Sequence, residues 1–227
     1  VTEQADRLKE LEMREAELQE EVRQRMLVIP NMLDRYPAEI SPDKKTQKRI
    51  ITAGRLVEQK GYDLLLDAWS KVHQKHPEWI LDIYGEGEDK TMLLEKRKNL
   101  ALENSVLFHP PTLDIYQKYM DSDFYVMSSR FEGFGLVLAE AMSCGIPCVS
   151  FDCPHGPSDI IKDYEDGLLV EKENIKELAD KICYLIENEN VRIKMGHKAR
   201  ENVKRFLPEN VMPQWKNLFE SLTYSSK

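Results

Sequence analysis

The chain has 227 residues, of which 41% are hydrophobic, so it is long enough and apolar enough to bury a core of ordinary size. Its formal net charge is −8 and its basic residues are scattered among a larger number of acidic ones, which argues against a nucleic-acid partner. It contains no apolar run near the roughly 20 residues of a membrane span and no secretory signal pattern, so we expect a cytoplasmic protein.

The cysteines give no sign of a metal site. Cys144, Cys148, Cys153 and Cys183 are spaced unlike paired zinc knuckles. Three of them lie in or near apolar segments, where cysteine behaves as a small hydrophobic side chain. The spacing therefore predicts neither metal binding nor disulfide bonds.

Residues 5–25 contain no Gly or Pro and are dominated by strong helix formers, which predicts a helix. Apolar side chains fall on one side of it at helical spacing, interrupted by Glu15. Two interpretations remain open, a helix packed on the body of the protein and a short coiled coil that makes a homodimer. The heptad pattern lasts too few turns to establish a coiled coil, so we favour packing on the body. The residues on the apolar side are Leu8, Leu11, Leu18, Val22 and Met26.

The next two segments lead to a domain boundary. MLVIPNML, residues 26–33, is typical of a short strand closed by Pro30 and Asn31. Residues 34–48 are a polar connector punctuated by proline. We therefore expect a charged helix and interdomain segment over 1–48, followed by a separate domain over 49–227.

From Arg49 onward, short apolar runs alternate with amphipathic helical patterns, which is typical of a parallel sheet with helices on both faces. We therefore expect an α/β, Rossmann-like domain that binds its ligand at the carboxyl ends of the strands. The strands are expected at 49–53, 79–85, 105–109, 123–129, 147–151 and 167–170. The helices are expected at 61–75, 88–101, 113–121, 135–144, 174–187, 190–204 and 209–222.

The loop after the first expected strand, GRLVEQKG at 54–61, has the outline of a diphosphate site. Gly54 allows a sharp turn off the strand, and Arg55 and Lys60 place two cations where an anion would meet the amides of the next helix. Taken alone, the loop fits a solvated segment with two idle basic residues equally well.

The loop after the second strand, YGEGED at 84–89, contains Gly85 and Gly87 before a helix. This position also suits a ligand-binding turn. A single G-x-G is weak support, however, because it is more often a tight turn.

The stretch RFEGFGLVLAEA, residues 130–141, carries two carboxylates around a glycine-rich turn into a helix. Gly133 and Gly135 leave the first helical N–H groups uncovered, so phosphate oxygens could approach them. Glu132 and Glu140 are eight residues apart, about 12 Å along a helix, and therefore cannot share one proton. Both could be ordinary helix residues. The apolar surroundings of Glu140 favour a functional role instead, because a buried carboxylate needs a partner.

These loops, together with GPSDIIKDYEDGLLV, resemble in order and spacing the C-terminal, donor-binding domain of retaining nucleotide-sugar glycosyltransferases of the two-Rossmann-domain (GT-B) type, group 1. The resemblance covers about residues 50–205. Its most specific part is a Glu, seven residues and a second Glu in an EGFG context.

The resemblance implies a role for each matching residue. Arg55 and Lys60 would neutralise the donor diphosphate, and Glu132 would contact the transferred sugar. The backbone amides of Phe134, Gly135 and Leu136 would face the phosphates and the sugar, and Glu140 would bind the ribose hydroxyls. UDP-sugar would be the donor, and no metal would be required because cations and amides stabilise the leaving group.

The resemblance also implies an N-terminal Rossmann domain that binds the acceptor, which residues 1–48 are too short to encode. We therefore expect the 227-residue chain to bind donor without transferring sugar. Its helices at 5–25 and 209–222 are expected to pack against the sheet domain or a second copy. In the full-length enzyme, association with the inner face of the membrane is compatible with the resemblance.

The aromatic and histidine residues around the EGFG turn have more than one interpretation. We expect Phe131 to be buried and Phe134 to be partly exposed. His155, in the turn CPHGP, could reach the donor, but a single loop histidine is more often solvated.

Two other functions remain to be tested. The chain could be a non-catalytic nucleotide-binding or scaffold module that recruits a partner through its N-terminal helix. A dinucleotide-dependent epimerase is disfavoured, because no G-x-G-x-x-G follows the first strand.

Overall fold

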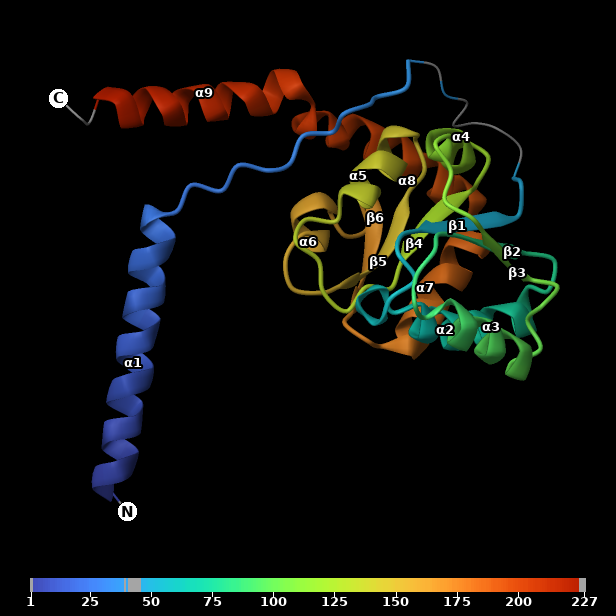
Figure 1. Cartoon of the computed structure of the whole chain (residues 1–227), viewed down its shortest axis with the longest axis horizontal. Coiled ribbons are helices and arrows are strands. Elements are labelled where there is room, and N and C mark those ends of the chain that lie inside the picture. The colour runs from blue at the N-terminus through green and yellow to red at the C-terminus, as the bar shows by residue number, and fades with distance from the viewer. Residues whose placement is uncertain (1, 39, 41–45, 225–227) are drawn as a thin grey trace. The chain divides into compact units, whose positions relative to one another are not determined.

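The computed structural model describes residues 2–38, 40 and 46–224 (Figure 1). The chain divides into two compact units, Val1–Pro30 and Asn31–Lys227. Residues 39 and 41–45 of the expected connector, and the side chain of Val22, lie outside the described residues. Among the described residues, no helix combines the length and apolar composition that crossing a membrane requires.

The first unit is dominated by helix α1, Thr2–Arg25, which contains the helix expected at 5–25. Leu8, Leu11 and Leu18 on its apolar side, and Met26 just after it, are exposed in the structure. Whether this side packs on the body or on a second copy stays a prediction.

The second unit is built on one six-stranded sheet in which all neighbouring strands are parallel. Their order is β3-β2-β1-β4-β5-β6, and each strand overlaps its expected range. The bounds are Arg49–Ala53 for β1, Ile80–Tyr84 for β2, Val106–His109 for β3, Phe124–Met127 for β4, Cys148–Asp152 for β5 and Gly167–Glu171 for β6.

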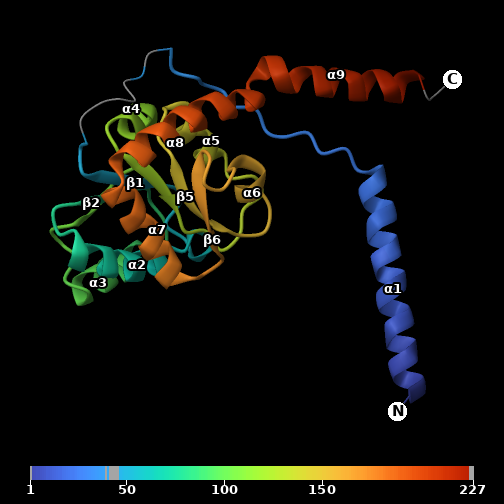
Figure 2. The ribbon, with the colours of Figure 1, turned by 180° about the vertical axis from the view of Figure 1, so that it is seen from behind.

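Helices cover both faces of this sheet (Figures 1 and 2). On one face α2 (Tyr62–Lys75) packs between α3 (Lys90–Asn99) and α7 (Ile175–Glu187), around a core that includes Trp69 and Phe151. The other face carries the four helices α4, α5, α6 and α8 and a core of aliphatic and tyrosine side chains. These helices are Ile115–Met120, Leu136–Ser143, Pro157–Ile160 and Glu189–Asn202.

The chain changes faces between neighbouring strands β1 and β4, because α2 follows β1 on one face and α5 follows β4 on the other. The loops that leave these two strands therefore diverge. In a doubly wound sheet, such a switch point at the carboxyl ends is where ligands bind. The predicted Rossmann-like α/β fold is confirmed.

Some local predictions are wrong. Residues 26–33 form no strand. A strand needs a hydrogen-bonded neighbouring strand, whereas the N–H of Leu33 donates at 2.8 Å to the carbonyl of Phe206 in a 3₁₀ turn, η2 (Val203–Phe206). Leu33, which belongs to the second unit, is nevertheless fully buried. Helix α6 and the 3₁₀ turn η1 (Glu58–Lys60) are not among the expected elements.

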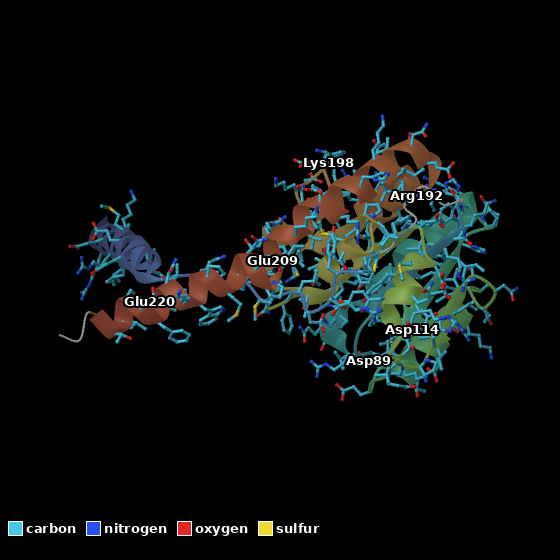
Figure 3. The ribbon with its side chains drawn as sticks, turned by 90° about the horizontal axis from the view of Figure 1, so that it is seen from above. Asp89, Asp114, Arg192, Lys198, Glu209 and Glu220 are labelled. Carbon is cyan, nitrogen blue, oxygen red and sulfur yellow. The ribbon has the colours of Figure 1, made fainter. Side chains whose placement is uncertain are left out.

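The final helix, α9, runs from Pro208 to Tyr224, with Glu209 and Glu220 labelled near its two ends in Figure 3. Val211 in its first turn is fully buried. Beyond its first turn the helix does not pack on the sheet domain within the single chain, because its apolar residues there are between 37% and 60% exposed. They are Met212, Trp215, Phe219 and Leu222. The other expected alternative, packing against a second copy, stays a prediction.

Candidate nucleotide-sugar donor site

The structure brings Lys60 and Glu132 together at the switch point. Lys60 ends η1 after strand β1, and Glu132 lies in the loop between β4 and α5. The ammonium Nζ of Lys60 lies 2.7 Å from Oε1 of Glu132, and the Ser129 hydroxyl donates to the same oxygen at 2.6 Å. The side chains of Lys60 and Glu132 are only 18% and 8% exposed. The site therefore contains a largely buried ion pair between two residues predicted to bind the donor.

Hydrogen bonds to backbone carbonyls hold the two loops against each other. The N–H of Arg130 donates to the carbonyl of Gln59 at 2.8 Å, and the Ser128 hydroxyl donates to the carbonyl of Lys60 at 2.9 Å. Gly61 has a φ of +62°, and a Cβ there would lie 2.1 Å from the carbonyl oxygen of Ser128. Only glycine permits both this conformation and this close approach.

Arg130 adds a side-chain clamp that the sequence reasoning misses. Its guanidinium donates to both carboxylate oxygens of Asp63 at 2.8 Å and to the carbonyl of Glu58 at 2.7 Å. Burial alone would raise the pKa of Asp63, but the hydrogen bonds and charge of Arg130 outweigh it and lower that pKa. The available signal is that Arg130 lies two residues before Glu132 of the EGFG turn, yet no local pattern links Arg130 to Asp63.

A pocket of about 470 Å³ opens beside the loops that carry the Lys60–Glu132 pair, at the ends of β1 and β2. Gly54, Arg55, Gly85 and Glu140 from the sequence predictions line it, and Arg55 is exposed. The rest of its wall is largely apolar or aromatic and consists of Ala53, Tyr84, Glu86, Pro111, Thr112, Ile115, Tyr119 and Val137. Its size and composition suit a small organic group that also carries hydroxyls or charge.

Of the two glutamates that line this pocket, Glu140 is the one predicted to bind the donor. Its Oε2 accepts a hydrogen bond from the Tyr119 hydroxyl at 3.2 Å. Burial raises the pKa of Glu140, and the bond from Tyr119 offsets only part of that rise. Burial thus disfavours the charged form of Glu140. The carboxylate can accept several hydrogen bonds, so it can also accept bonds from the hydroxyls of a ligand.

The glycines of YGEGED bring two loops together. A Cβ at Gly85 would lie 2.0 Å from the carbonyl oxygen of Gly54, and one at Gly87 would lie 2.2 Å from that of Leu56. Gly85 also lines the pocket, whereas Gly87 is not among its lining residues. The tight-turn interpretation therefore accounts for Gly87 without a ligand.

The EGFG turn leaves open space at Gly133, just before the start of α5. Gly135 is its N-cap, with a φ of +85° and no side-chain cap, and Leu136 is its first residue. A Cβ at Gly133 would have nothing within 4 Å. The helix N-terminus therefore has the open approach that an anion requires.

The two phenylalanines of this turn differ from each other. Phe134 is half-buried, with its ring 5.3 Å from that of Phe206 in an edge-on arrangement. Phe131, predicted to be buried, is 56% exposed. Its backbone carbonyl accepts from Gln59 at 3.0 Å, which fixes the loop without burying the ring.

The turn CPHGP packs directly behind the EGFG turn. The N–H of Glu132 lies 3.5 Å from the carbonyl oxygen of Pro154, and a Cβ at Gly156 would lie 2.0 Å from that of Phe134. His155 itself adopts a left-handed φ of +63°. The turn therefore supports the backbone that presents Glu132.

A second cavity, of about 460 Å³, lies at the amino ends of the strands. Two buried charged side chains that line it, Arg192 and Asp123, are already paired with each other. Arg192 of α8 (Figure 3) lies 3.8 Å from Asp123 and donates to Thr46 at 2.7 Å. The N–H groups of Gln47 and Arg49 also bond to Asp123. This cavity is therefore held together by internal pairing and is a weaker candidate than the switch point.

Comparison with known proteins identifies the family. Residues 38–202 match the model of the family "Glycosyl transferases group 1", so the chain belongs to this family, as the sequence motifs predict. The chain is 35% identical over 175 residues to an uncharacterized glycosyltransferase of Haemophilus influenzae, covering 77% of this chain and 50% of that protein.

Solved structures agree with this assignment. A mutant of Staphylococcus aureus TarM in complex with fondaparinux, alpha-GlcNAc-glycerol and UDP has a TM-score of 0.77 and 32% identity, covering 85% of this chain and 39% of that one. The pneumococcal O-GlcNAc transferase GtfA in complex with UDP and GlcNAc has a TM-score of 0.72 and 30% identity, covering 86% and 38%. The chain thus spans half or less of the length of these relatives.

Proposed function

We propose that this chain is the donor-binding half of a glycosyltransferase that transfers a sugar from UDP to an acceptor hydroxyl, with retention at the anomeric carbon. The observation that carries the proposal is the buried Lys60–Glu132 pair, which lies at the switch point in a loop pair beside the pocket lined by Glu140. Membership of the glycosyltransferase family and the UDP in the TarM and GtfA structures support the choice of donor.

Each end of the donor has a partner in this arrangement. The nucleoside occupies the pocket, where Glu140 accepts hydrogen bonds from the ribose hydroxyls. The diphosphate meets the charges of Arg55 and Lys60 and the backbone amides of Phe134, Gly135 and Leu136, which lead into α5. The sugar then extends past Gly133 to Glu132.

In the transfer step the bond between the sugar and the diphosphate breaks, and negative charge grows on the departing UDP. Lys60, Arg55 and the α5 N-terminus are placed to stabilise that charge, so we infer that a metal ion is not required. The acceptor oxygen forms its bond to the anomeric carbon on the face from which the diphosphate departs, and the acceptor's hydroxyl proton passes to the departing diphosphate oxygen. Positioning of the acceptor oxygen can contribute several orders of magnitude in rate.

The relatives extend well beyond the part that this chain matches, and we infer that the acceptor-positioning groups lie in that further part. The 227-residue chain is therefore expected to bind donor weakly and to transfer no sugar by itself. Transfer at a rate comparable with that of a longer homologue would contradict this inference.

Calorimetric titration with UDP, UDP-GlcNAc and UDP-glucose tests the proposal, with ADP as a comparison nucleotide and with and without EDTA. We expect UDP and its sugars to bind, ADP to bind more weakly, and EDTA to have no effect. Lys60→Ala and Arg55→Ala should each weaken UDP binding by about 1–3 kcal/mol, the range for charge-assisted hydrogen bonds.

The matched control is Lys204→Ala, which removes an equal charge from an exposed residue paired with Glu201. It should leave UDP binding unchanged. The absence of heat or stabilisation at millimolar UDP would exclude the proposed donor site. UDP binding without turnover by a longer natural form of the protein would favour the scaffold function instead.

A further inference from the structure

A second group of ligand-type side chains lies between α2 and α7. His76 is the C-cap residue of α2, and Cys183 and Glu187 lie one turn apart on α7. One donor atom from each of the three lies within 4.8 Å of the others, and Nε2 of His76 is 2.9 Å from Oε1 of Glu187. We propose that His76, Cys183 and Glu187 bind a zinc ion, with water as the fourth ligand.

The donor set favours zinc over the harder cations. A thiolate, an imidazole and a carboxylate are the three ligand types that zinc accepts, whereas magnesium and calcium prefer oxygen alone. A tetrahedral zinc ion separates its ligand atoms by about 3.3–3.7 Å, given zinc bonds of about 2.0–2.3 Å. Donor atoms within 4.8 Å of one another can therefore reach this geometry through side-chain rotation.

The burial of the three residues also suits an ion. Cys183 is only 4% exposed, whereas the side chains of His76 and Glu187 are 17% and 54% exposed. The thiol therefore forms the floor of the site, and the imidazole and carboxylate form a rim through which an ion can enter. A hydrogen bond between His76 and Glu187 that happens to lie beside a buried thiol is the alternative that the experiment must exclude.

The site is expected to be structural. Parallel strands and the helices that follow them run in opposite directions, so the C-terminal ends of α2 and α7 lie away from the strand ends that carry Lys60 and Glu132. An ion at this place would join α2 to α7, two of the helices that cover one face of the sheet. Its removal should lower stability without changing donor binding.

Cobalt substitution gives a direct readout. The chain is treated with EDTA, dialysed and titrated with Co²⁺, and the near-ultraviolet thiolate charge-transfer band is recorded. We expect one Co²⁺ per chain, a band that Zn²⁺ displaces, and loss of the band in Cys183→Ser. Zinc affinity, measured by competition with a chromophoric chelator, should fall about 10-fold or more in His76→Gln and in Glu187→Gln.

The matched control is Cys144→Ser, which alters an equally buried thiol on the other face of the sheet and should retain the band. The absence of a thiolate band in the unaltered chain would overturn the proposal, as would a band that survives Cys183→Ser. If Cys183→Ser fails to fold, the unaltered chain and Glu187→Gln, changed at a more exposed position, still decide the question. UDP binding in EDTA is measured in parallel, so the failure of this site and of the donor site can be distinguished.

Discussion

Glu132→Gln is expected to strengthen the binding of UDP while it abolishes the preference for a particular UDP-sugar. In the free protein the ammonium of Lys60 is paired with Glu132 at 2.7 Å. A diphosphate bound by Lys60 would therefore lie close to a second anion. Glutamine keeps the shape of the side chain and removes its charge.

The magnitude follows from the geometry of the pair. A phosphate oxygen held by Lys60 would lie about 4–5 Å from the carboxylate, where two unit charges repel by about 3–4 kcal/mol at an effective dielectric constant of 20. Solvent reaches Lys60, which is 18% exposed, and screens this repulsion. We therefore expect Glu132→Gln to strengthen UDP binding by about 1 kcal/mol, which lowers the dissociation constant about 5-fold. One effect works in the opposite direction, because Lys60 without its partner Glu132 gains rotamer freedom that it must lose again when it binds the diphosphate. For a fully free lysine this costs up to about 2 kcal/mol. This loss should be small here, because the side chain of Lys60 is already largely buried.

The assay is calorimetric titration of the unaltered chain and Glu132→Gln with UDP and two UDP-sugars. Glu220→Gln on α9 is the control, because it makes the same change in net charge at a distant exposed position. UDP binding 5-fold weaker in Glu132→Gln would refute the reasoning. It would mean that Glu132 serves mainly to hold Lys60 in place.

Three further substitutions test other parts of the site. Burial raises the pKa of Glu140, so the folded state binds its proton more tightly than the unfolded state does. The stability of the chain should therefore fall as the pH rises from about 4.5 through the raised pKa. Glu140→Gln should remove this pH dependence, measured by urea unfolding, and increase stability at pH 7. Arg130→Ala should cost about 1–2 kcal/mol at pH 7 and less at pH 3, because the lowered pKa of Asp63 contributes stability that is lost as pH falls through it; an equal cost at both pH values would contradict the ion-pair account. Gly133→Ala should change stability by less than about 0.5 kcal/mol, since its Cβ would point into open space, yet weaken UDP-sugar binding about 10-fold; unchanged sugar binding would show that the sugar does not pass there.

The sequence predicts the sheet well, because every strand is a short apolar run between turn residues and most of the helices carry an apolar face toward it. It does not predict strand order, which depends on pairing between residues far apart. The same limit applies to the site. Lys60 and Glu132 are both selected from their loops, but their ion pair joins residues 72 positions apart.

The local errors have physical causes as well. Phe131 is apolar and therefore expected inside, yet an apolar residue in a loop fixed by its backbone can remain exposed. Arg130 is passed over because an arginine beside a glycine-rich turn is usually solvated. Its partner Asp63 becomes visible only when the loops after β1 and β4 are placed side by side.

The packing of α2 against α7 constrains the order of events while the chain is being synthesised. Helix α2 ends at Lys75 and α7 begins at Ile175, so about 100 residues must be added before α2 can be covered. At about 5–20 residues per second this takes about 5–20 s, during which the apolar side of α2, including Leu65 and Trp69, lacks its final neighbour. A ribosome that stalls before α7 emerges would therefore present a nascent chain with one face of its sheet covered only by α2 and α3, a substrate for chaperones and proteases.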